Sequence, residues 1–165
     1  SDRTREAISG PGTKLFIDDT SASIGTTQIL GELISFDVTY NGAEAFKRFM
    51  ENQNTYAARL DQGAKLVSGQ VRLEHSNRRE VDKFKSMSGR AIRFSQTGSV
   101  IDATATPSPT TKHAVIDVYR AIWTDTTPSA RANNLTRTYS FWGFYDSTET
   151  NIFEVDAKHT MSALP

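Results

Sequence analysis

Three kinds of side chain in this sequence could carry chemistry: histidines, grouped carboxylates, and a run of arginines and lysines. His75, His113 and His159 lie far apart and show no metal-ligand spacing, so we interpret each as a surface or strand-end histidine. The acidic pair Asp18-Asp19 and the carboxylates within 146–149 lack the spacing of a calcium-binding loop. We interpret them as solvated turn residues and predict no metal site.

The motifs of the common enzyme classes are missing. The sequence contains no G-x-S-x-G, no H-E-x-x-H and no phosphate-binding glycine pattern. Gly10-Pro11-Gly12 indicates a turn, because Pro11 has no N–H group to donate. No Cys is present, which excludes a thiolate nucleophile, disulfides and Cys-ligated zinc or iron–sulfur centres. A glycosidase-type carboxylate pair is not indicated either. We therefore predict a protein that is not an enzyme and has no cofactor.

The charge pattern is the strongest remaining signal. A local excess of +4 arises where basic residues outnumber Glu80 and Asp82: Arg78, Arg79, Lys83, Lys85, Arg90 and Arg93. Acidic residues gather in two other places: Asp18, Asp19, Glu32 and Asp37, and Asp146, Glu149, Glu154 and Asp156. The basic run fits either a solvated helix face or a contact surface for an acidic patch or a phosphate backbone.

Opposed patches within a chain of zero net charge suit head-to-tail self-assembly, in which one face of a subunit meets a different face of the next. The candidate contacts between subunits or rings are Arg78, Arg79, Lys83, Asp18, Asp19 and Glu32.

Length and composition limit the fold that must position these residues. The chain has 165 residues, with 19 basic and 19 acidic side chains, and this length fits one domain. No apolar run approaches 18 residues, so we expect no membrane insertion by this chain. The composition also excludes a disulfide scaffold, a coiled coil and a generally basic nucleic-acid binder.

Alternating apolar and polar residues predict a chain made mainly of antiparallel strands. The clearest alternation places Ile34, Phe36, Val38 and Tyr40 on one face. The predicted strands are residues 14–18, 33–40, 65–75, 91–94, 113–123, 136–145 and 152–157. Residues 146–151 are expected to form the hairpin turn between the last two, and 98–112 and 125–134 to form loops.

A helix is predicted over residues 76–88. Ser76 or Asn77 would be its N-cap, and Glu80 would complete a capping box with Asn77. Gly89 would follow its last turn, and its buried stripe would consist of Val81, Phe84 and Met87.

A second, weaker helical pattern covers residues 43–51. The expected fold class is therefore an antiparallel β-sandwich or barrel with one flanking helix at about 76–88 and long inter-subunit loops. Residues 1–12 are expected to form an extended N-terminal arm, and residues 13–165 a single domain.

This order of elements resembles the tail tube proteins, or major tail proteins, of tailed bacteriophages. The resemblance lies in residues 8–12 leading into 14–19, in the strand–helix–strand centre over 68–94, and in the closing segments 139–146 and 152–155. It implies a small β-sandwich with a flanking helix that associates as hexameric rings. Strands of neighbouring subunits join into an inner barrel, and the rings stack into a hollow tube.

The resemblance also implies partners and a location. The chain would bind itself head-to-tail and surround a tape-measure protein, with a sheath added if the tail contracts. Genomic DNA would pass through without specific binding. The protein would be assembled in the host cytoplasm and located in the tail of the virion. Residues 43–65 correspond to a long loop in this family, which makes that segment a candidate ring-to-ring contact.

An alternative class of function stays open at this point. A β-sandwich binding module, such as a carbohydrate-binding or virion-decoration domain, would present exposed aromatic residues as a platform. Trp123, Trp142 and Tyr145 are the candidates for such a platform, although core or subunit-interface positions suit them as well.

Overall fold

The computed structural model describes residues 12–41, 44–46, 60–62, 66–74, 78–102, 110–131 and 134–158. In chain order these residues form β1 (Thr13–Asp18), η2 (Ser21–Ser23), β2 (Gln28–Ile29), β3 (Leu33–Asn41), β4 (Glu44–Phe46), β5 (Leu60–Gln62), β6 (Leu66–Glu74), α1 (Arg79–Lys85), β7 (Arg90–Asp102), β8 (Thr110–Arg131), β9 (Asn134–Gly143) and β10 (Phe153–Lys158). No helix in this part of the chain is long and apolar enough to cross a membrane.

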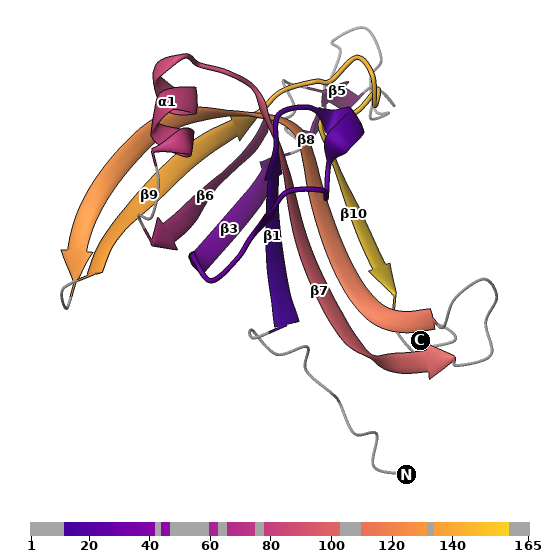
Figure 1. Cartoon of the computed structure of the whole chain (residues 1–165). Helices are drawn as coiled ribbons and strands as arrows, with labels where there is room; N and C mark the ends of the chain where they lie inside the picture. The colour runs from indigo at the N-terminus through magenta and orange to yellow at the C-terminus, as the bar shows by residue number, and fades with distance from the viewer. Residues whose placement is uncertain are drawn as a thin grey trace, which may run out of the picture.

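Eight of the strands form one antiparallel sheet in the order β2-β1-β7-β8-β9-β6-β3, with β10 added beside β8. β8 is 22 residues long and arches across the molecule (Figure 1). Its residues 113–118 lie between β7 and β10, and its residues 121–131 pair with β9. The single sheet is thereby bent into two layers, one on each side of the arch.

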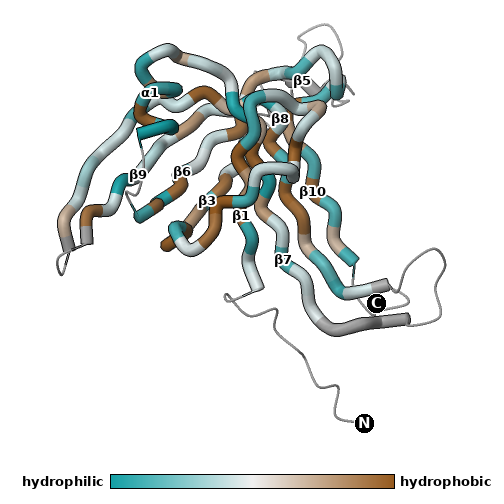
Figure 2. The backbone as a smooth tube through the Cα atoms, in the orientation of Figure 1, coloured by the Kyte–Doolittle hydropathy of each residue, from teal (hydrophilic) through white to brown (hydrophobic). Residues whose placement is uncertain are grey.

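The core fills the space between these two layers. β1 and β7 supply buried residues from one layer, β6 and β9 from the other, and β8 from both: Leu15, Ile17, Val67, Val71, Leu73, Ile92, Phe94, Val118, Ala121, Trp123, Tyr139 and Phe141. Phe36 of the edge strand β3 stacks on Phe94 of β7 with ring centroids 4.1 Å apart, which joins the two layers. Hydrophobic positions accordingly recur along the inner strands in Figure 2.

The predicted fold class is confirmed: the protein is mainly β and sandwich-like, with one flanking α-helix in the part of the chain that the structure describes. The strands expected from alternation at 14–18, 33–40 and 65–75 are present. Leu15 and Ile17 are fully buried, and Phe36 and Val38 pack against the core, as their shared faces required.

Two predicted loops are largely strand. β7 continues to Asp102 and β8 begins at Thr110, so the described residues of the expected 98–112 loop lie in two paired strands. β8 likewise continues to Arg131 and pairs with β9 through the expected 125–134 loop. Threonine is frequent in both segments and favours extended backbone, so the polar composition that indicated loops is compatible with strands.

The helix predicted over 43–51 is wrong where it can be compared. Residues 44–46 form β4, which pairs with β5. The remainder of that prediction, and residues 1–11 of the expected arm, lie outside the described residues.

The main helix is shorter than predicted, and its ends differ from the expected caps. Arg78 is the N-cap residue and makes no side-chain capping bond. The helix stops at Lys85, so Met87 lies beyond it and is exposed. Met87, and not Gly89, is the residue with positive φ (+50) that follows the last turn. Ser76 and Asn77 lie outside the described residues.

The predicted final hairpin is also wrong. Residues 146–151 do form a tight turn, closed by a bridge between Asp146 and Asn151. However, β9 pairs with β8 and β6, whereas β10 pairs with the first half of β8. The turn therefore connects the two layers of the sandwich instead of two adjacent strands.

Candidate assembly surfaces

The carboxylate of Asp18 is used inside its own chain. It accepts hydrogen bonds from the backbone N–H groups of Gly25 (2.8 Å), Thr26 (3.2 Å) and Thr27 (2.9 Å), and from the Thr26 hydroxyl (2.8 Å). Burial alone would raise the pKa of Asp18, but hydrogen bonds from Thr27 and Thr26 outweigh it and hold the pKa below its ordinary value. Gly25 has φ +88, and a Cβ there would lie 2.6 Å from Arg93, so this loop needs glycine.

A buried ion pair attaches α1 to the sandwich. Arg90, at the start of β7, is 1% exposed and donates to both carboxylate oxygens of Glu80, at 2.8 and 3.1 Å. Its guanidinium also donates to the backbone carbonyl of Ile17 at 3.3 Å. The indole N–H of Trp123 donates to Glu80 Oε2 at 3.0 Å. Glu80 thus connects the helix to β7 and β8, and does not cap the helix.

Asp19 adds a second carboxylate to this cluster. It accepts a hydrogen bond from Arg90, and its Oδ1 lies 2.8 Å from Lys83 Nζ. Arg79 lies 3.9 Å from the other oxygen. The hydrogen bond with Lys83, together with Arg90 and the other cations, holds the pKa of Asp19 below its usual range despite the opposing effect of desolvation.

Three of the residues predicted to make contacts between subunits therefore meet within one chain: Asp19, Arg79 and Lys83. Asp18 is buried, and Arg78 is exposed at the start of α1. Whether these residues also contact another subunit stays a prediction. Arg90, which we counted with the exposed basic run, is instead a buried partner of Glu80.

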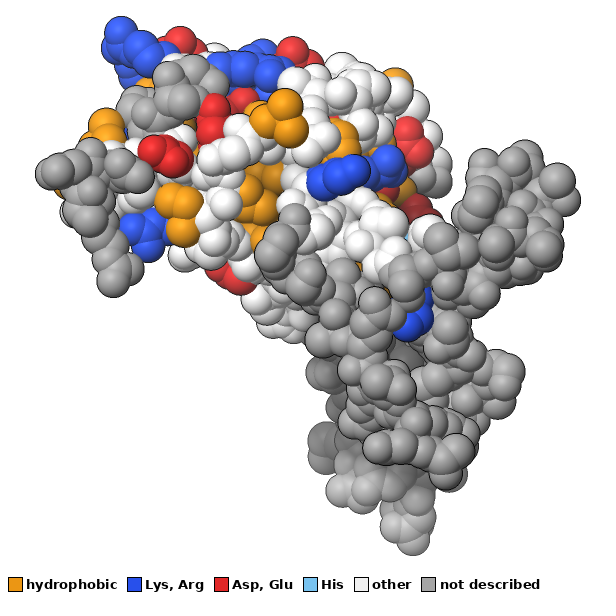
Figure 3. All heavy atoms as spheres, turned by 60° about the horizontal axis from the view of Figure 1, so that its bottom comes forward, with side chains coloured by type: hydrophobic (Ala, Val, Ile, Leu, Met, Phe, Trp, Pro, Cys, Tyr) orange, Lys and Arg blue, Asp and Glu red, His pale blue; other side chains and the backbone are white. Residues whose placement is uncertain are grey.

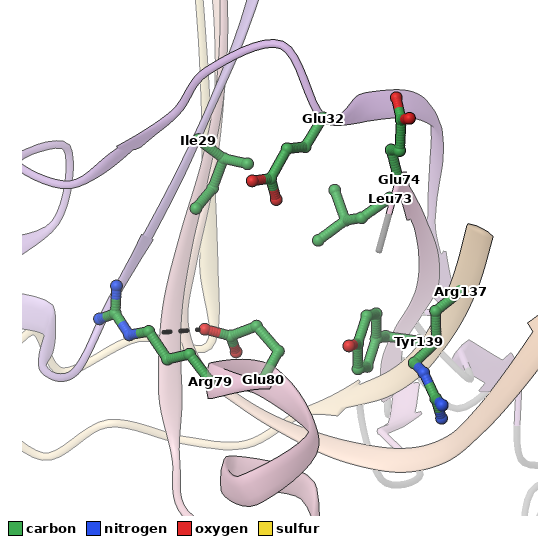
Figure 4. Close-up of a pocket in the computed structure, with 8 residues that line it drawn as sticks. All are labelled: Ile29, Glu32, Leu73, Glu74, Arg79, Glu80, Arg137 and Tyr139. Atoms are coloured by element: carbon green, nitrogen blue, oxygen red, sulfur yellow. Dashed lines mark ion pairs between the residues drawn. The ribbon is translucent and has the colours of Figure 1, made fainter. Parts of the chain in front are cut away.

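Glu32, the sixth predicted contact residue, lines a small cavity of about 40 Å³ beside Glu80 (Figure 4). Leu73 lies beside Glu32, and Tyr139 and Arg137 lie across the cavity from Glu80. Burial raises the pKa of Tyr139 to about 12, which keeps the phenol protonated at neutral pH. Among the described residues, no group of three or more His, Asp or Glu side chains is arranged to hold a metal ion.

Glu149, Glu154 and Asp156, three of the predicted acidic residues, line a shallow groove over β7, β8 and β10. At the same groove the guanidinium of Arg93 makes two hydrogen bonds of 2.7 Å to Asp117. Hydrogen bonding to Asp117 raises the pKa of Arg93. The groove is acidic overall, but its one cation is already paired.

Two long strand edges are open. β3 pairs with β6 along one edge, and no strand in the described part of the chain pairs with its other edge. The second half of β8 pairs with β9 on one side, whereas its pairing with β7 on the other side stops at Ala121. The four strands β3, β6, β9 and the second half of β8 thus form a half-sheet with an open edge on each side, and an open edge is a template for another chain.

One face of this half-sheet packs on the core and the other is polar. Register places the side chains of the polar face in rows across the four strands: Thr127, Thr138, Arg72 and Ser35; Asp125, Ser140, Gln70 and Asp37; and Ile122, Trp142, Ser68 and Thr39. Six of these twelve side chains carry a hydroxyl group, and two, Ile122 and Trp142, are apolar. Arg72, the one cation among the twelve, donates to the hydroxyl of Thr136 at 3.1 Å.

The candidate aromatic platform is split by the fold. Trp123 is buried and its ring packs at a tilt against that of Tyr139, with ring centroids 5.2 Å apart, so it cannot bind an external ligand. Trp142 and Tyr145 are about half exposed. The core position predicted for Trp123 as the common alternative is confirmed, and the binding-module hypothesis loses one of its three aromatics.

The sequence did not indicate the two open edges or the Glu80–Arg90 pair. The open edges depend on which strands become neighbours, and local alternation does not report that. The pair had a usable signal, namely a glutamate on the inner side of a predicted helix ten residues before an arginine at the start of a strand.

No protein-family model matches this sequence, and a search of curated proteins finds no match. Solved structures do match. A structure of the SPP1 tail tube covers 93% of this chain and 82% of its own, at 12% identity and a TM-score of 0.54. The Hcp1 protein of the E. coli EAEC 042 pathovar covers 88% and 97%, at 11% identity and a TM-score of 0.47. Another Hcp protein covers 88% and 98%, at 13% identity and a TM-score of 0.39. The chain has the fold of the SPP1 tail tube protein.

Proposed function

We propose that this chain is the structural subunit of a tube, the tail tube of a phage or of a related injection machine. The half-sheet with two open edges is the observation that carries this proposal. The fold shared with a tail tube protein supports it, because the family resemblance implies that strands of neighbouring subunits join, and open edges would allow this. The role is structural and not catalytic.

Ring closure would pair the open edge of β3 in one subunit with the open edge of the second half of β8 in the next. Such pairing would satisfy the backbone N–H and C=O groups that an isolated edge leaves to water. The second layer of the sandwich and α1 cover the apolar face of the half-sheet, so the polar face would line the channel. The number of six subunits in a ring comes from the family resemblance.

The polar face suits a channel for DNA. Its three rows contain one cation, Arg72, two carboxylates, Asp37 and Asp125, and hydroxyl and amide groups, with the apolar Ile122 and Trp142 at one end. Few cations means few phosphate contacts, which are the main source of nonspecific affinity for DNA. In this proposal genomic DNA passes without being held, and a tape-measure protein occupies the channel beforehand. The subunit belongs to the virion tail, inside a sheath if the tail contracts.

The test is microscopy of the purified protein together with sedimentation over a range of concentrations. Negative staining should show rings or tubes about as wide as a phage tail. Sedimentation should show large species that grow with concentration. A strictly monomeric protein at high concentration that binds glycans would refute the proposal and favour the binding module.

A further inference from the structure

The exposed large hydrophobic side chains gather at the two ends of the half-sheet. Where β3 begins and β6 ends lie Leu30, Ile34 and Leu135, which we call the lower patch. Where β6 begins and β9 ends lie Leu66, Trp142, Phe144 and Tyr145, which we call the upper patch. Of the ten such residues among those described, Tyr40, Met87 and Val155 lie outside both patches; Tyr40 is on the other face of the half-sheet, where its ring centroid lies 4.8 Å from that of Phe153. The two patches lie at opposite ends of the neighbouring strands β3, β6 and β9.

The surface between the patches is polar, so the patches are local features and not part of a generally apolar face. Ser140, Gln70 and Asp37 form the middle row of the polar face. Figure 3 looks onto the lower end, where hydrophobic side chains reach the surface among polar and charged ones. Leu30 is 74% exposed and Ile34 is 50% exposed, so half or more of each side chain stays in contact with water in a single subunit.

We propose that the lower patch of one copy packs against the upper patch of another copy, so that subunits join end to end along the strand direction. The inference rests on the proposed function and assigns the contact by which rings would stack. Two different patches on one subunit give a heterologous contact, which repeats without closing on itself when copies are added along one direction. Lateral pairing of strand edges and this end contact use different surfaces, so both can form at once.

The available area fits a contact between proteins. Trp142 is 50% exposed and Tyr145 56%, and an aromatic side chain has roughly 150–250 Å² of surface, so each of the three aromatics offers about 100 Å². The upper patch therefore presents roughly 300 Å², and more with Leu66. A standard interface uses about 800 Å² per partner, of which ~57% is apolar, or about 450 Å². The patch supplies most of the apolar part of one such side.

The first experiment removes each patch separately. Trp142→Ser and Ile34→Ser change exposed side chains and should leave the circular dichroism spectrum of the subunit unchanged. Met87→Ser and Val155→Ser are matched controls, because they remove exposed hydrophobic residues outside both patches. We expect each patch variant to raise the concentration needed for tubes at least about tenfold while rings still form, with the controls at the wild-type value.

The second experiment uses the absence of cysteine from the chain. The double variant Ile34→Cys/Trp142→Cys should give a ladder of disulfide-linked oligomers after oxidation of assembled protein. The matched pair Met87→Cys/Val155→Cys should give none. Normal tubes from both patch variants, or tubes without a ladder, would overturn the end-to-end contact and leave the proposed function standing. A wild-type protein that forms neither rings nor tubes would instead refute the proposed function.

Discussion

Replacing Glu80 with alanine tests the claim that one buried carboxylate fixes the helix to the sandwich. The change removes two hydrogen bonds from Arg90 and one from Trp123, and leaves a fully buried guanidinium and a buried indole N–H without that acceptor. Removing one member of a buried pair costs about 3–5 kcal/mol of unfolding free energy. For a chain of this length that corresponds to a fall in melting temperature of roughly 6–20 °C.

The assay is urea unfolding at a protein concentration below assembly. Asp82→Ala is the matched control, because Asp82 lies on the same helix and is exposed; its effect should stay within about 0.5 kcal/mol. The double variant Glu80→Leu/Arg90→Met should recover most of the loss, because it removes both charges together. A Glu80→Ala protein as stable as the control, or a double variant less stable than the single one, would refute this account of the cluster.

Three further outcomes follow from the geometry. Because the pKa of Asp18 is lowered in the folded state, its ionised carboxylate stabilises the fold above the unfolded pKa of about 4, and this stabilisation is lost as pH falls through the folded pKa. Asp18→Asn should therefore lower the free energy of unfolding at pH 7 and weaken its dependence on acid pH, as measured by urea unfolding at several pH values. Gly69→Ala should cost roughly 1–3 kcal/mol by thermal unfolding, since its Cβ would lie 2.2 Å from a backbone oxygen, whereas Gly89→Ala should be tolerated. Met87→Gly should raise the melting temperature slightly by relieving a positive φ.

The alternation of residues predicted most strands because each layer has one apolar face. Leu15, Ile17 and Phe36 show this directly, since each lies on the core-facing side of its strand, as the alternation of apolar and polar residues predicted. The extent of β8 was missed because Pro128 and the polar residues around it have the composition of a loop. An edge strand can hold a proline where its nitrogen faces away from the partner strand, and this part of β8 pairs on one side only.

The candidate contact residues were only partly predictable, because charge along the sequence does not say which charges are already paired. Asp19 and Lys83 are 64 positions apart and meet only because β1 ends beside α1. The capping-box pattern drew attention to Glu80 but gave it the wrong role, since Arg90 and Trp123 reach it from other elements. The exposed hydrophobic residues at the strand ends have no pattern of their own in the sequence, and they become a group only when the register aligns β3, β6 and β9.

The length of β8 also has a mechanical consequence. A pull on the β8/β9 hairpin is carried along one continuous backbone into the opposite layer, where β7 and β10 hold the same strand on both sides. Sliding β8 out of that position requires several inter-strand hydrogen bonds to be loaded together, so the two layers resist tension as one body. A load applied to the β8/β9 end of the molecule would therefore reach the β7/β10 end through one strand and the hydrogen bonds on both of its sides.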